Sequence, residues 1–396
     1  MHLAISSEEY RNRVNAVLDI MKGKELGGFV FWNATSVFYL TGFAFIPTER
    51  PICLVLSKDG SKTMFVPRLE VEHAKEAPEI QDVAFYPEYM GMKHPLNLLA
   101  DKIRDMGLST GNIGADADGY GSPQGYRGPR LSEVLPSAKI VVLRDLVEEL
   151  RVIKSEQEIT LIRESAKWGN LAHTLLQEYS LPGRTENEIS MRASLEATLT
   201  MIKTLGSSFS PLSTGRSGAS AGFRGQIGPN SALPHAITIN AVLRIGDVLV
   251  TGAGSSMAGY GSELERTMFV GEPSPEQSKF FNLMKEVQEV AFDNIRPGRK
   301  CSHVDNAVRA FYEKNSLWEY WRHHTGHALG LLGHEGPFFD EGDNTTIVPG
   351  MVFSVEPGLY VPGMGGFRHS DTIVVTETGM DFITYYPREL DKLICG

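Results

Sequence analysis

Cysteine is scarce in this chain of 396 residues, which contains only three. Cys53, Cys301 and Cys395 lie far apart, form no metal-binding spacing and are odd in number, so we expect free thiols. Disulfides persist in oxidising compartments, and their absence is typical of a reducing one. Because the N-terminus also lacks a basic and then apolar leader, the sequence predicts a cytoplasmic protein.

Long apolar runs are missing too, since no stretch approaches the roughly 18 residues that a membrane span needs. Basic residues are outnumbered, 38 against 48 acidic ones, which gives a net charge of −10. Such a surface favours solubility and argues against bulk nucleic-acid binding. We therefore expect a small-molecule substrate, no nucleic acid and no membrane as partners.

The length exceeds what one hydrophobic core usually serves, which predicts two domains. Strands alternate with helices up to about residue 150, so residues 1–150 read as a smaller α/β domain. A capping box, Ser155-x-x-Glu158, then starts a long helix, and more helices and strands follow to the end. We expect residues 151–396 to form a second domain, and the whole chain to be α/β (α+β).

Two glutamates stand close together in the short strand-like stretch Gly259–Thr267. Alternate side chains of a strand share a face, so Glu263 and Glu265 point one way and Arg266 the other. Paired carboxylates repel each other, and burial raises that cost. The pair is therefore either an acid/base or ligand site or a solvated charged face.

Histidine clusters near the C-terminal end, where four of the 11 histidines lie between His323 and His334. His334-Glu335 is not an HExxH zinc motif, because no second histidine follows it at the required spacing. His235 ends a stretch rich in Gly, Ser and Pro, and its ordinary pKa suits acid/base work. A structural, hydrogen-bonded histidine is the alternative for His235.

Glu356 lies in an apolar strand just before a turn, and a buried glutamate needs a cation, a metal or a hydrogen-bonding substrate. Arg368 is a candidate partner, and Asp371 competes for the same guanidinium. An Arg368–Asp371 ion pair that only stabilises a turn is therefore an equal alternative.

Taken in order, these pieces resemble the creatinase/prolidase superfamily, the pita-bread hydrolases. The resemblance implies an N-terminal creatinase/prolidase-like domain, a C-terminal pita-bread catalytic domain, cleavage of a C–N bond and a homodimer. The motifs that carry it are Tyr39–Phe43, Leu150–Ser155, Pro234-His235, Gly326-His327, His334–Pro337, Glu356–Gly358 and Gly366–Thr372.

The chain departs from the metal-ligand set that peptidases of the superfamily use. Thr251 and Ser370 stand where two metal carboxylates are expected, and Glu263 stands in place of an aspartate. His327 and Glu356 match the remaining ligands. Two metal ions are therefore not expected, and any single Mn, Zn or Co ion would be held by Glu263, His327 and Glu356.

Creatinase, which works without metal, is similar to this chain at Leu264–Thr267. The resemblance implies that His235 is the general acid/base and that Glu265 and Glu356 grip the substrate. The remaining candidate substrate-binding residues are Glu263, His327, His334 and Arg368.

The leading hypothesis is thus a metal-independent hydrolase, without cofactor, that cleaves a C–N bond in a small cationic or peptide-like substrate. One alternative is an Xaa-Pro peptidase with one metal ion or an unusual metal set. The other is a catalytically silent binding protein that has kept the pocket.

Overall fold

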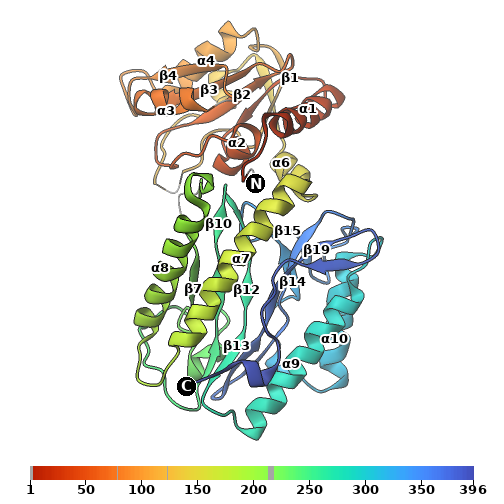
Figure 1. Ribbon diagram of the computed structural model, residues 1–396. Helices are drawn as coiled ribbons and strands as arrows, with labels where there is room; N and C mark the ends of the chain where they lie inside the picture. The colour runs from red at the N-terminus through yellow and green to blue at the C-terminus, as the bar shows by residue number, and fades with distance from the viewer. Residues whose placement is uncertain (1–2, 78, 123, 213–217) are drawn as a thin grey trace. The chain divides into compact units, whose positions relative to one another are not determined.

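The computed structural model of the protein describes residues 3–77, 79–122, 124–212 and 218–396. Two compact units divide the chain, Ile5–Arg151 and Val152–Gly396, the second of which also includes the N-terminal end. Both units combine helices with sheets, which confirms the predicted mixed α/β class. Figure 1 shows the two units in turn along the chain.

The N-terminal unit is built around a six-stranded sheet with the order β4-β3-β2-β1-β5-β6. Antiparallel pairs join β1 to β2 and β2 to β3, and the outer pairs are parallel. Its strands are β1 (Leu26–Phe31), β2 (Cys53–Ser57), β3 (Lys62–Pro67), β4 (Asp82–Tyr86), β5 (Gly111–Ala115) and β6 (Ala138–Val142). Its helices are α1 (Ser7–Gly23), α2 (Ala34–Thr41), α3 (Val71–Glu76), α4 (Pro95–Asp105), α5 (Leu131–Val134) and α6 (Leu146–Arg151).

The C-terminal unit contains a larger sheet with the order β15-β14-β16-β19-β12-β9-β7, and β20 pairs with β19. These strands are β7 (Ser220–Gly222), β9 (Gly252–Gly254), β12 (Leu264–Glu265), β14 (Gly326–Ala328), β15 (Glu335–Phe339), β16 (Val352–Val355), β19 (Ser370–Val375) and β20 (Met380–Phe382). The smaller sheets use β8 (Val248–Val250), β10 (Ser256–Met257), β11 (Tyr260–Gly261), β13 (Thr267–Val270), β17 (Gly358–Val361), β18 (Gly365–Arg368) and β21 (Ile394–Cys395).

Two helix pairs accompany these strands: α7 (Glu156–Tyr179) with α8 (Glu186–Leu205), and α9 (Pro275–Asn294) with α10 (Cys301–Lys314). Figure 1 shows α7 lying across the strands with α8 beside it, and α9 and α10 as a second pair. The predicted capping box is confirmed, because Ser155 accepts from the Glu158 amide and the Glu158 side chain returns to the Ser155 amide. Local sequence therefore sets where α7 begins.

Strand register brings a set of polar side chains onto one face of the larger sheet. His327 lies directly opposite Ser354, Ser354 opposite Thr372, and Glu265 opposite Ser370. Directly opposed residues of antiparallel strands share a face, as do residues two apart in one strand. The register thus gathers on one face side chains that lie about a hundred positions apart in sequence.

The opposite face carries Arg266, whose side chain is fully buried. Its guanidinium donates to Asp371 Oδ1 at 2.7 Å and to the backbone carbonyls of Glu265 and Ser370 at 2.7 and 3.0 Å. The C-terminal carbonyls of Tyr386 and Pro387 accept its other hydrogens. A buried guanidinium is tolerated only when its donors are met, and here they are.

All three cysteines are buried and free, as expected. Within the described residues, none of the helices is both long enough and apolar enough to cross a membrane. The predicted cytoplasmic location stays a prediction.

Removing the charge of Asp371 tests the importance of this buried pair. We expect Asp371→Asn to lower the free energy of unfolding by about 3–5 kcal/mol, because the Arg266 charge would stay buried without its counter-ion. Chemical denaturation of the full-length protein, followed through the unfolding of its C-terminal unit, measures the change in the free energy of unfolding. Glu188→Gln, which removes the exposed Arg184–Glu188 pair, is the control and should cost less than about 1 kcal/mol. Equal stability of the Asp371 variant and the parent would contradict the assignment.

Candidate functional site

A cavity of about 490 Å³ opens within the C-terminal unit. Its wall is formed by small residues of β7, β9, β10 and β11 and by the loop 329–333. Glu265 reaches it from β12, and Glu263 from the residue before β12. Arg224 reaches it from the turn after β7. The paired glutamates therefore line a cavity rather than a solvated outer face.

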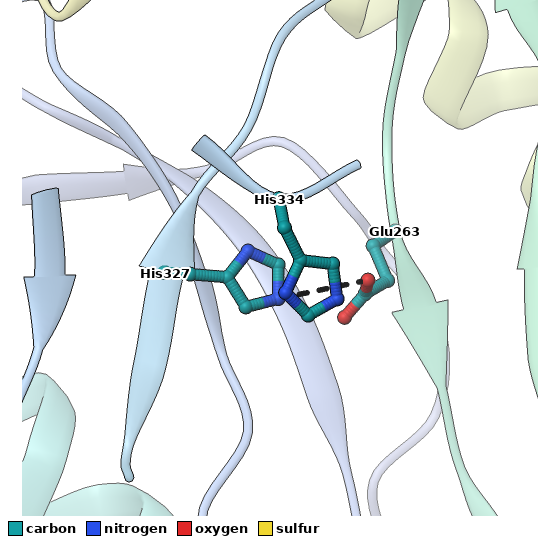
Figure 2. A group of neighbouring side chains, drawn as sticks. All are labelled: Glu263, His327 and His334. Carbon is teal, nitrogen blue, oxygen red and sulfur yellow. Dashed lines mark ion pairs between the residues drawn. The ribbon is translucent and has the colours of Figure 1, made fainter. Parts of the chain in front are cut away.

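Glu263, which lines this cavity, converges with His327 and His334, and Figure 2 shows the three side chains pointing toward one another. Their candidate ligand atoms all lie within 4.8 Å of one another. His327 Nε2 is 4.0 Å from Glu263 Oε2, and the two imidazole rings are stacked with centroids 3.8 Å apart. His327 is fully buried on β14, and His334 is exposed on the loop before β15.

The tautomer of His327 follows from its surroundings. Nδ1 lies 3.0 Å from the Ala328 carbonyl, which can only accept, so Nδ1 carries a proton. Nε2 is buried and has no hydrogen-bond partner among the described residues, although Glu356 Oε1 is 3.2 Å away. Burial lowers the pKa of His327, but Glu356 and Glu263 outweigh it and raise the pKa to about 9. Near neutral pH Nε2 therefore carries a proton that it can donate to Glu356, and it becomes a metal ligand only when a binding ion displaces that proton.

Glu263 is held by two serines. Its Oε1 accepts from the hydroxyls of Ser354 and Ser370, both at 2.7 Å. Its backbone amide donates to Thr372, whose own hydroxyl donates back to the Glu263 carbonyl. Only Oε2 is left to face His327, so the carboxylate is oriented before any ligand arrives.

Glu265 is buried and forms a bidentate ion pair with Arg368, through Nε to Oε2 and through Nη2 to Oε1. Arg224 Nη2 adds a contact of 3.2 Å to Oε1. Burial raises the pKa of Glu265, with Glu263 and Glu356 adding to the rise and Arg368 opposing it. Glu265 thus already grips a guanidinium, and that guanidinium belongs to the protein itself.

Glu356 follows β16 on the same face as Ser354 and lies between His327 and Arg368. Burial acts to raise its pKa, but His327 and Arg368 outweigh burial and lower the pKa. Arg368 Nη1 also donates to the Tyr360 hydroxyl at 2.8 Å, which in turn contacts His323 Nε2 at 2.7 Å. Burial lowers the pKa of His323 to about 4, so this chain of groups ends on a neutral imidazole.

Two sequence expectations meet a different outcome, and a third stays untested. The proposed Arg368–Asp371 pair is wrong, because β19 turns Asp371 to the opposite face, where it binds Arg266. A grip of Glu265 on a cationic substrate is not supported, since Arg368 already binds both of its carboxylate oxygens. His235 is exposed on a turn. Its predicted acid/base role stays a prediction.

Three residues of the site carried no clear sequence signal. Ser354 could have been found by alternation, since it lies two positions before Glu356 in an apolar strand. Tyr360 and Arg224 could not have been found in this way. Tyr360 lies in β17 and Arg224 in the turn after β7, and no local sequence pattern shows that these segments reach the site.

A pair of metal ions does not fit these residues. The Thr251 hydroxyl is already bonded to His173 Nε2 at 2.7 Å and to the backbone of Arg266. The Ser370 hydroxyl is bonded to Ser354 and Glu263. Glu265 is bound by two guanidinium groups, so its carboxylate is not free to bridge two cations. A dinuclear site needs several free carboxylates, and positions 251 and 370 supply none here.

One divalent ion does fit. Glu263 Oε2, His327 Nε2 and His334 offer one oxygen and two nitrogen donors, a set typical of Zn²⁺ and related ions. Ligands of one ion with bonds of about 2.1 Å lie about 3–4 Å apart, so only small side-chain shifts are required. This set contains His334 where the sequence analysis expects Glu356, which itself lies 3.2 Å from His327 Nε2.

Comparison with known sequences assigns both units. The sequence model of metallopeptidase family M24 matches residues 160–377, and that of the creatinase/prolidase N-terminal domain matches residues 13–153. A probable dipeptidase PepE of Mycobacterium tuberculosis is 29% identical over 385 residues, which cover 97% of this chain and 96% of that protein.

Solved structures give the same result. An Xaa-Pro dipeptidase from Bacillus anthracis has a TM-score of 0.79 and 26% identity, covering 97% of this chain and 99% of that one. Dipeptidase PepE from Mycobacterium ulcerans has a TM-score of 0.79 and 27% identity, covering 99% of each. The predicted superfamily is thereby confirmed.

The number of metal ions bound per chain tests whether the site holds one divalent ion rather than two. After chelation and dialysis, the protein should bind one Mn²⁺ per chain, measured by calorimetry and elemental analysis. His327→Ala should abolish binding, whereas His324→Ala, outside the cluster, should not. Restoring both carboxylates by Thr251→Asp and Ser370→Glu should move the stoichiometry towards two. Two ions in the parent protein would contradict this assignment.

Proposed function

We propose, from the premise that this chain belongs to metallopeptidase family M24 and carries a creatinase/prolidase N-terminal domain, that it is a peptidase of short Xaa-Pro peptides using one divalent ion. The convergence of Glu263, which lines the cavity, with His327 and His334 is the observation that carries the proposal. The printed names of the relatives, dipeptidase and Xaa-Pro dipeptidase, supply the substrate class. The activity is hydrolysis of a C–N bond in either reading.

The chain's own residues have separable roles in this proposal. A divalent ion, when bound, would polarise the scissile carbonyl and make water more acidic. Glu263, His327 and His334 would hold it. Glu356 would accept the proton of the attacking water and pass it to the leaving nitrogen, and the pKa lowered by His327 and Arg368 makes it a weak base for this step. Ser354 and Ser370 keep Glu263 oriented.

Metal-independent hydrolysis is the second candidate. The specific observation in its favour is the loss of carboxylates at Thr251 and Ser370, together with the internal pairing of Glu265. In that reading His327, with its raised pKa, would supply the positive charge that polarises the substrate.

Chelation separates the two readings. Hydrolysis of an Xaa-Pro dipeptide should fall to background after chelator treatment and return when Mn²⁺, Co²⁺ or Zn²⁺ is added. Glu356→Gln should lower kcat/KM by about 10²- to 10⁴-fold because the proton acceptor is lost. Glu286→Gln, an exposed site on α9, is the matched control and should leave turnover unchanged.

Full activity in the chelated enzyme would reject the metal-dependent proposal in favour of the second candidate. Metal binding without any turnover would leave the silent binding protein, the third reading of the sequence.

We also propose that the protein is a homodimer. One face of α8 exposes large apolar side chains at helical spacing, which monomeric proteins seldom leave uncovered. The first turn of α8 is acidic and its last turn is basic, so two antiparallel copies related by a two-fold axis complement each other. The exposed residues on this face are Met191, Leu195, Leu199 and Ile202, at 72%, 61%, 58% and 44% exposure.

Charging this face should separate the copies. Leu195→Asp with Leu199→Asp should shift the protein from dimer to monomer, because a carboxylate in an apolar interface is costly. Light scattering coupled to size exclusion measures the mass. Leu181→Asp, an exposed leucine outside α8, should leave the dimer intact. A monomeric parent protein would reject the proposal.

A further inference from the structure

Arg224 is the only basic residue among the described residues that line the cavity. Its side chain is 54% exposed there, unlike the buried Arg368 behind it. Most of the remaining wall consists of glycine, alanine and serine, which leaves room for a ligand to approach the guanidinium. A half-exposed cation in an enclosed wall is a natural anchor for an anion.

Glu265 does not need Arg224 for charge balance. Both of its oxygens are already met by Arg368, through a buried bidentate pair. Arg224 reaches only Oε1 of Glu265 and the side-chain oxygen of Gln226, each at 3.2 Å and both from Nη2. Its Nε and Nη1 make no hydrogen bond within the described part of the chain. Arg224 can therefore offer these donors to a ligand while Nη2 keeps its contact with Glu265.

The backbone around Arg224 is held in an unusual conformation. Arg224 has a φ of 52°, in the left-handed region that is unfavourable for a residue other than glycine. Gly225 follows with a φ of 76°, and a Cβ there would lie 2.1 Å from the Ile237 carbonyl oxygen. The buried carboxylate of Glu186 fixes the turn by accepting the amides of Gly225 and Ile239. The turn directs the Arg224 side chain to the cavity, and the hydrogen bonds of Glu186 hold the backbone in this strained conformation.

We infer that Arg224 binds the free carboxylate of the substrate and so makes the chain a dipeptidase, an inference that rests on the proposed peptidase function. Glu265, which Arg224 contacts, has a carboxylate within 4.8 Å of that of Glu263. The anion anchor is thus one side chain away from the candidate metal ligands. A dipeptide has a matching layout, because its carboxylate lies one residue, about 3.8 Å between Cα atoms, from the scissile bond. The guanidinium would grip both carboxylate oxygens.

The test compares an Xaa-Pro dipeptide with its C-terminal amide. In the parent enzyme kcat/KM should favour the free acid, and Arg224→Gln should reduce that preference by about 10- to 100-fold, mainly through KM. Arg224→Lys should restore part of it, since lysine keeps the charge without the bidentate geometry. Arg244→Gln, an exposed arginine outside the cavity, should retain the full preference.

An equal loss for acid and amide would mean that Arg224 only supports the structure, and the inference would be overturned. If the parent enzyme hydrolyses neither compound, the proposed function fails, and calorimetric binding of the same two compounds decides the inference. Tighter binding of the acid in the parent but not in Arg224→Gln would support it, and equal binding would overturn it.

Discussion

The buried pair of Arg266 and Asp371 is the interaction on which the site depends. The Arg266 guanidinium binds the backbone carbonyls of Glu265 and Ser370, so it fixes the two strands on either side of the polar face. Because side chains alternate, an arginine held on one face leaves Glu265 only the other. The Arg266–Asp371 pair that stabilises the core thus also fixes the direction of the Glu265 side chain. A rearrangement of the site would therefore disturb this buried ion pair.

Charge balance explains why this polar face can stay buried. Glu263, Glu265 and Glu356 are close enough to repel one another strongly. Arg368 neutralises Glu265 and lies 3.7 Å from Glu356, and His327 lies 3.2 Å from Glu356. The protein therefore supplies by itself most of the positive charge that two metal ions would bring. What remains open is the outward oxygen of Glu263, and that is where a single cation has a place.

Sequence alone predicts the parts of this arrangement that depend on local periodicity. Alternation placed Glu263 and Glu265 on one face, and the capping box at Ser155 marked the start of α7. The predicted pairing of Arg368 with Glu356 is confirmed at 3.7 Å, but its closer partner Glu265 was not predictable, because it lies 103 positions away on a strand that does not pair with β18. Arg224 was missed for a similar reason, since its left-handed turn is held by Glu186 on a different element.

The serines at the site change how tightly a metal ion can bind. A glutamate at position 370 would face Glu263, and two carboxylates at that distance would require a cation. Ser370 instead donates a hydroxyl, as does Ser354, so Glu263 is satisfied without metal. Both hydroxyls bind Oε1 and leave Oε2 outward, so metal binding need not break either bond. They therefore act as supports that orient a ligand rather than as competitors for it. The expected outcome is a preorganised site of modest affinity, since one carboxylate and two neutral imidazoles offer less charge than the bridged carboxylates of a two-metal centre.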